Sequence, residues 1–168
     1  MFFKDVRVPK ANLLGDLNGA FVHLMTNLAQ ERIKIAIAAI AGAEHLLEIT
    51  TEYVKEREAF GRPLARLQHV RFEIAEMATE CAVTRAFLDR CIADHEDREL
   101  DAVHASMAKW WATELQKRVA DRCLQLHGGY GYMAEYRVAK AFTDARVQTI
   151  YGGTTEIMKE IIGRSLLS

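Results

Sequence analysis

The chain has 168 residues, about the length of one domain, and half of them are hydrophobic, which is enough for a sizeable core. Its 22 Lys and Arg residues nearly balance its 23 Asp and Glu residues, so the net charge of -1 gives no electrostatic reason to expect binding to nucleic acid or an anionic membrane. The longest apolar stretch, residues 35–43, is too short for a membrane span. The three cysteines form no Cys-x-x-Cys pair, which favours reduced thiols over a disulfide framework or a zinc site.

The first residues predict a strand followed by a turn. Residues 2–8 (FFKDVRV) mix aromatic and β-branched residues and stop at Pro9, as strands do. A single strand leaves its own backbone groups unpaired, so this one either pairs with another chain or belongs to a sheet outside this sequence. Residues 11–20 then form a turn, with Asn18 as the expected N-cap of the next helix.

Three long helices are predicted next. The first covers residues 20–58, and its segment 33–43 is apolar nearly all round, which indicates a central helix. The second carries a heptad seam, because its apolar positions are alternately three and four residues apart. The third covers residues 102–126 after a polar loop at 95–101. The seam consists of Leu67, Val70, Ile74, Met77, Cys81, Thr84, Leu88 and Cys91, and the third helix is expected to turn Met107, Trp110, Trp111, Leu115 and Val119 inward.

The last third of the chain predicts shorter elements. The glycines of HGGYGYM (127–133) suit a left-handed helix cap. A short helix is expected at residues 134–144, a turn at Gly152 and Gly153, and a final helix at residues 155–166. The predicted fold is therefore all-α, an up-and-down four-helix bundle with extra short C-terminal helices and a short N-terminal extended segment.

Three motifs could carry chemistry, and each also has an ordinary structural explanation. The Gly-rich segment HGGYGY could present backbone N–H groups to a phosphate, or it could simply cap a helix. The segment YGGTTE (151–156) could bring backbone close to a ligand, or it could be an N-capping turn. Glu31 lies at the edge of an apolar run, where it could be a general base or a solvated side chain on a helix face. No Glu-x-x-His pair of a di-iron bundle occurs, so no metal site is predicted.

Four segments support a functional interpretation of these motifs because they occur together in the order of a known family. They are FFKDVRVPKANLLGDLNGAF (2–21), REAFGRPL (57–64), QLHGGYGY (125–132) and TDARVQTIYGGTTEI (143–157). Together they cover essentially the whole chain and resemble the last β-domain strand, the linker and the C-terminal bundle of acyl-CoA dehydrogenases. VTRAFLDRC (83–91), ASMAKWWATELQ (105–116) and IYGGTTEIMKE (150–160) are most similar to the long-chain branch of that family.

The resemblance implies α,β-dehydrogenation of an acyl-CoA thioester, in which a carboxylate takes the α-proton and a flavin accepts the β-hydride. Many family members place that carboxylate where this chain has Gly152. The long-chain and isovaleryl branches place it on the first long helix before an Arg, which corresponds to Glu31 followed by Arg32. The resemblance therefore implies that Glu31 is the catalytic base and that Arg32 lies near the CoA moiety. Gly152 and Gly153 would lie on the substrate side, with Gly152 leaving room for the Glu31 carboxylate or the acyl chain.

The resemblance also implies that the chain binds flavin adenine dinucleotide (FAD). Arg57 matches a family position close to the FAD pyrophosphate, where a guanidinium makes paired charge-assisted hydrogen bonds. Some of the implied cofactor contacts come from a neighbouring subunit, so a homodimer or homotetramer is expected. The implied FAD-binding residues are Arg57, Phe60, Gln68, Gln125, Gly128, Gly129, Thr154 and Glu156.

Full-length members of the family carry further domains before this one. Residues 1–18 are therefore expected to be the remaining strand and linker of a missing β-domain, and residues 19–168 the bundle, which could be inactive alone. The full enzyme would pass electrons to an electron-transferring flavoprotein, in the bacterial cytoplasm or, in a eukaryote, the mitochondrial matrix. Two alternatives stay open: a non-catalytic module for oligomerisation or acyl-CoA binding, and a flavoenzyme similar to an acyl-CoA oxidase.

Overall fold

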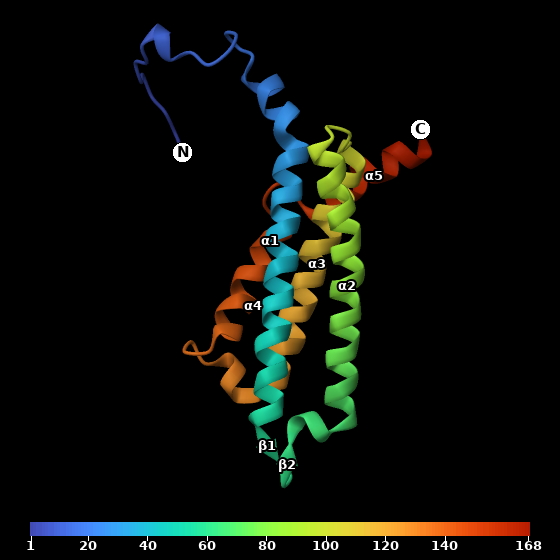
Figure 1. Cartoon of the computed structure of the whole chain (residues 1–168). Helices are drawn as coiled ribbons and strands as arrows, with labels where there is room; N and C mark the ends of the chain where they lie inside the picture. Colours follow the sequence, from blue (N-terminus) through green and yellow to red (C-terminus); the bar gives the residue numbers. More distant parts are fainter.

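The protein is an up-and-down helical bundle in the computed structural model, which describes all 168 residues (Figure 1). Helices α1 (Ala20–Glu56), α2 (Gln68–Glu96) and α3 (Ala102–His127) run alternately down and up, and the shorter α4 (Arg137–Gln148) returns beside α3. Helix α5 (Thr155–Leu167) packs on α3 at the end of the bundle nearer the N-terminus. The predicted all-α four-helix bundle with an extra C-terminal helix is confirmed. None of these helices has the length and hydropathy needed to cross a membrane.

Short elements connect the helices. A hairpin of two-residue strands, β1 (Glu58–Ala59) and β2 (Arg62–Pro63), follows α1. The sequence predicted only a break there, yet Phe60 and Gly61 both have positive φ, the geometry that joins two short antiparallel strands. Single 3-10 turns occur at Lys10–Asn12, Leu64–Arg66 and Gly128–Tyr132.

The core forms where α1 and α3 meet. Ala36, Ala39 and Ala43 on α1 are fully buried, and Ala108 and Ala112 on α3 are at most 3% exposed. These small side chains let the two helix backbones approach closely. The heptad seam of α2 closes the core from the other side, because most of its predicted positions are buried: Val70, Met77, Cys81, Thr84, Leu88 and Cys91.

The prediction that Trp111 belongs to the core is wrong. Trp111 is 42% exposed, because the inward positions of α3 at this level are taken by small residues that its indole would displace. The indole lies instead at the α2–α3 edge, where Nε1 donates to Thr84 Oγ1 at 2.9 Å and the Arg118 guanidinium lies over the ring. Met107 and Trp110 are half-buried, whereas Leu115 and Val119 are fully buried as predicted.

The N-terminal predictions need two corrections. Residues 2–8 form no strand and are exposed, since this chain offers them no second strand for their backbone groups. Asn18 is not the N-cap of α1: the cap position is Gly19, without a side-chain hydrogen bond, and Asn18 has a positive φ of 65°.

In addition, α4 begins at Arg137, three residues later than predicted.

Leu115 allows a direct test of this core. It is fully buried between the long helices, so Leu115→Ala should leave a cavity that the surrounding helices refill only in part. We expect the free energy of unfolding to fall by about 2–5 kcal/mol, measured by urea denaturation monitored by circular dichroism. Leu167→Ala, at a 91% exposed position, should change it by less than about 0.5 kcal/mol. Equal effects of the two changes would contradict the assigned core.

Candidate functional site

The residues implied by the resemblance fall into two groups at different levels of the bundle. Glu31 and Arg32 lie in the first half of α1, while Arg57 directly follows its last residue. Helix α1 is unbroken between them, and 26 residues at 1.5 Å per residue correspond to about 39 Å. One group is therefore called the glycine-cap end and the other the Glu31 end. The glycine-cap end comprises Arg57, Phe60, Gln68, Gln125, Gly128 and Gly129, and the Glu31 end comprises Glu31, Arg32, Gly152, Gly153, Thr154 and Glu156.

At the glycine-cap end, four of the predicted residues line one cavity of about 600 Å³: Arg57, Gln125, Gly128 and Gly129. The Arg57 guanidinium lies 5.2 Å from the centroid of the Tyr130 ring and has no carboxylate partner. No atom lies within 4 Å of the place that a Cβ of Gly128 or Gly129 would occupy, so this backbone is open to close approach. An unpaired cation beside open backbone in a cavity suits a phosphate group.

The glycine cap is held by an aromatic stack. The Tyr53 and His127 rings are stacked with centroids 4.0 Å apart, and the Tyr53 hydroxyl donates to the His127 carbonyl at 3.3 Å. The His127 ring donates from Nδ1 to the Cys123 carbonyl at 2.8 Å, and burial lowers the pKa of His127. Gly128, next along the chain, is the C-cap of α3 with a φ of 59°. This stack fixes the end of α3 from which the glycines project.

Two of the predicted cofactor residues at this end do not line the cavity. Phe60 is 90% exposed at the tip of the hairpin, and Gln68 is an exposed residue in the first turn of α2. Ala59 and Leu64, which flank Phe60, do line it, so the hairpin lies beside the cavity although its tip points elsewhere.

At the Glu31 end, the two adjacent α1 residues face different surroundings. Glu31 is exposed and makes no hydrogen bond within the chain. Arg32 is buried, and its guanidinium donates to Ser106 Oγ on α3 at 3.3 Å. Its Nε has no partner, and burial lowers the pKa of Arg32. Glu31 is thus free to reach a substrate, whereas Arg32 is anchored to α3.

The turn between α4 and α5 packs against the same helix. Gly152 and Gly153 both have positive φ, 66° and 102°, a conformation that favours glycine. A Cβ on Gly152 would collide with Ile35 Cδ1. Ile35 is four residues after Glu31 and so lies on the same face of α1. The space left by the missing side chain at position 152 is therefore filled by Ile35, directly beside Glu31.

The start of α5 is built as a capped helix. The Thr154 hydroxyl accepts the Ile157 N–H at 3.3 Å, which is the N-capping arrangement. Glu156 is exposed in the first turn, and its pKa lies below the usual range because its carboxylate accepts its own backbone N–H and the Thr154 hydroxyl. Both side chains therefore stabilise the start of α5.

Sequence reasoning missed Lys109. It is fully buried on α3, and its Nζ donates to the Gly153 carbonyl at 2.6 Å. Burial lowers the pKa of Lys109 on balance, while the Glu114 charge acts to raise it and the Arg32 charge to lower it. The one signal available was a lysine within the otherwise apolar run ASMAKWWA (105–112).

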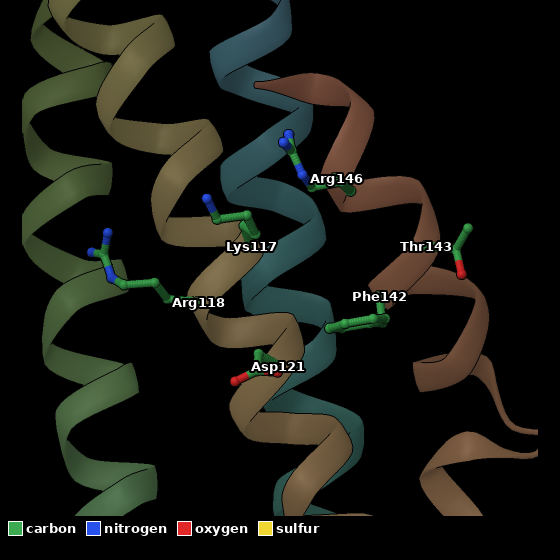
Figure 2. Close-up of a pocket in the computed structure, with 6 residues that line it drawn as sticks. All are labelled: Lys117, Arg118, Asp121, Phe142, Thr143 and Arg146. Atoms are coloured by element: carbon green, nitrogen blue, oxygen red, sulfur yellow. The ribbon is translucent and has the colours of Figure 1, made fainter. Parts of the chain in front are cut away.

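A further cavity of about 560 Å³ lies between α3 and α4 and contains none of the predicted site residues (Figure 2). Its cations are exposed or half-buried, and all three already have partners within the chain: Lys117 pairs with Glu114, Arg118 pairs with Glu80, and Arg146 donates to the Thr149 hydroxyl. It is lined by Lys117, Arg118, Asp121, Phe142, Thr143 and Arg146.

Fold and site together define an all-α bundle with a cation beside open glycine backbone at one end and a free carboxylate beside a glycine turn at the other. Residues 20–167 match the family described as "Acyl-CoA dehydrogenase, C-terminal domain", and the chain belongs to this family.

Known proteins agree with this assignment. The chain is 54% identical over 168 residues to the mitochondrial long-chain specific acyl-CoA dehydrogenase of Rattus norvegicus, covering 100% of this chain and 39% of that protein. It is 41% identical to an acyl-CoA dehydrogenase of Bacillus subtilis, covering 99% of this chain and 44% of that protein. The crystal structure of acyl-CoA dehydrogenase from Geobacillus kaustophilus superposes with a TM-score of 0.95 at 50% identity, covering 98% of this chain and 43% of that one. The chain thus spans about two fifths of the length of these relatives.

Proposed function

We propose that this chain is the C-terminal domain of a flavin-dependent enzyme that dehydrogenates long-chain acyl-CoA thioesters between Cα and Cβ. The observation that carries the proposal is the packing of Gly152 against Ile35, one helical turn from Glu31. A carboxylate is absent from position 152 and present at position 31, on the α1 face that this turn covers. The long-chain substrate class is supported by the 54% identity to the rat long-chain specific enzyme.

In this proposal Glu31 removes the α-proton of the bound thioester. It is exposed and not engaged with any cation of its own chain, so its oxygens are free to meet the substrate. The turn at Gly152 and Gly153 forms the opposite wall, and it packs against Ile35 of α1 and Met158 of α5. Arg32, anchored to Ser106, would lie near the CoA moiety of the substrate.

The glycine-cap end fits FAD. The Arg57 guanidinium, without a carboxylate partner, would pair with the pyrophosphate, and the open backbone at Gly128 and Gly129 would approach the same group. Gln125 lines the same cavity. Bound FAD supplies the acceptor for the β-hydride.

The two ends imply an oligomer. Because about 39 Å of unbroken helix separates Glu31 from Arg57, one cofactor does not reach both residues of the same chain. A homodimer or homotetramer that pairs the glycine-cap end of one chain with the Glu31 end of another would complete the site. Residues 1–18 would link the bundle to a preceding β-domain, and an electron-transferring flavoprotein would reoxidise the enzyme.

Anaerobic titration of the complete enzyme with a long-chain acyl-CoA tests the proposal. We expect the visible flavin band to bleach with one equivalent of substrate per FAD and an enoyl-CoA to appear. Slow recovery of the band in air and rapid recovery with an electron-transferring flavoprotein would support a dehydrogenase. Rapid recovery in air would instead support an acyl-CoA oxidase. A protein that forms an oligomer and takes up no FAD would contradict both and favour a non-catalytic module.

A further inference from the structure

Lys109 is in a position that stability alone does not explain. Its side chain is fully buried in α3, and none of the ion pairs of the chain includes it. A buried ammonium without a carboxylate partner is costly, and an apolar side chain of similar volume would usually serve a bundle core as well or better. The Glu114 and Glu156 carboxylates attract the ammonium without forming an ion pair with it, and the buried Arg32 on the neighbouring helix repels it.

The one hydrogen bond of the Lys109 side chain goes to the glycine turn. Nζ donates to the Gly153 carbonyl at 2.6 Å, in a turn whose two glycines have left-handed φ values. The turn is closed by a backbone hydrogen bond from the Thr155 N–H to the Thr149 carbonyl at 3.1 Å. Lys109 therefore holds the part of the loop, residues 152–154, whose backbone N–H groups make no backbone hydrogen bond.

The same turn is also in contact with the helix that carries Glu31. Gly152 packs against Ile35, and Ile35 and Glu31 share one face of α1. The Arg32 guanidinium, next to Glu31, donates to Ser106, which is three residues before Lys109 on α3. Helix α3 thus holds both walls of the Glu31 end, one through Ser106 and the other through Lys109.

We infer that Lys109 is a positioning residue: from beneath the glycine turn it fixes the distance between Gly152 and the Glu31 face of α1. The inference rests on the proposed function for its effect on turnover, and on the hydrogen bond to Gly153 for its effect on the turn. Displacing one wall by about 1 Å is enough to lower the rate of an aligned proton transfer about 10²-fold.

Lys109→Met tests the first part on this chain alone. The Met side chain is one atom shorter than that of Lys and similar in volume, and it donates no hydrogen bond. We expect hydrogen exchange at the Thr155 amide to become about tenfold faster, as the loss of one hydrogen bond predicts, with no change in the core of α2. Lys140→Met is the matched control, since Lys140 is an exposed lysine of α4 that makes no ion pair and no side-chain hydrogen bond. Unchanged exchange at Thr155 would overturn the inference whatever the protein does catalytically.

Turnover tests the second part in the complete enzyme. We expect Lys109→Met to lower kcat about 10²-fold while FAD content and substrate KM change less than about threefold, because a displaced wall affects alignment more than binding. Faster exchange with a normal kcat would show that the turn is held but positions nothing. If Lys109→Met does not fold, Lys109→Gln replaces it, since its shorter side chain also fails to reach Gly153. An inactive wild-type enzyme would overturn the proposed function and leave the exchange result standing.

Discussion

Replacing Glu31 by Gln is expected to lower kcat of the complete enzyme by about 10²–10⁴-fold, the usual contribution of a general base. Gln has the same shape but accepts no proton from Cα of the substrate. Because Glu31 is exposed and makes no hydrogen bond, the free energy of unfolding should change by less than about 0.5 kcal/mol. The rate is measured by anaerobic stopped-flow bleaching of the flavin band in a single turnover, so that reoxidation does not limit it.

Glu48→Gln is the control for this change, since Glu48 is another exposed carboxylate of α1 and contacts only His45. It should leave the bleaching rate unchanged. FAD content should be equal in both variants, because neither residue lies at the glycine-cap end. A Glu31→Gln enzyme that bleaches at the wild-type rate would mean that another group takes the α-proton, and the role of Glu31 would have to be abandoned.

The regular parts of the fold were predictable because one periodic signal decides them. The heptad seam of α2 is read from spacing alone, and its buried residues, such as Met77 and Leu88, follow it. Trp111 shows where that reading fails. Which face of α3 turns inward depends on α1, whose Ala36, Ala39 and Ala43 select small partners, and a bulky aromatic is then displaced to the edge. How two helices pack depends on the side chains of both, so neither sequence segment alone predicts it.

The candidate site was predictable only as a set of residues, not as an arrangement. The stack of Tyr53 on His127 joins positions that are 74 residues apart, and no local pattern links them. The role of Lys109 was not predictable for a different reason. Lysine side chains are mostly exposed in proteins, whereas this one is fully buried. Tyr53 and Lys109 are recognisable only when the chain is folded, since each contacts a glycine segment contributed by another part of the bundle.

Mixing two inactive variants should restore activity. Arg57→Glu places a negative charge where the FAD pyrophosphate is proposed to bind, and Glu31→Gln removes the base at the other end of the same helix. If each site joins the two ends of different chains, some sites in mixed dimers receive Arg57 from one chain and Glu31 from the other. With equal amounts of both chains pairing at random, about a quarter of all sites are intact, so about a quarter of wild-type activity is expected when FAD fills the sites that keep Arg57 and leaves the Arg57→Glu sites empty. Co-expression followed by a dehydrogenation assay measures it.

The double variant, Glu31→Gln with Arg57→Glu, distinguishes this geometry from a site made within one chain. Mixed in equal amounts with wild type, it should leave about a quarter of the activity if sites cross chains, because every mixed pair then has one defect in each site. Sites contained in single chains would leave about half the activity, and the two single variants would stay inactive when mixed. The length of α1 favours the first outcome, since no bend or break brings residue 57 back toward residue 31 within its own chain.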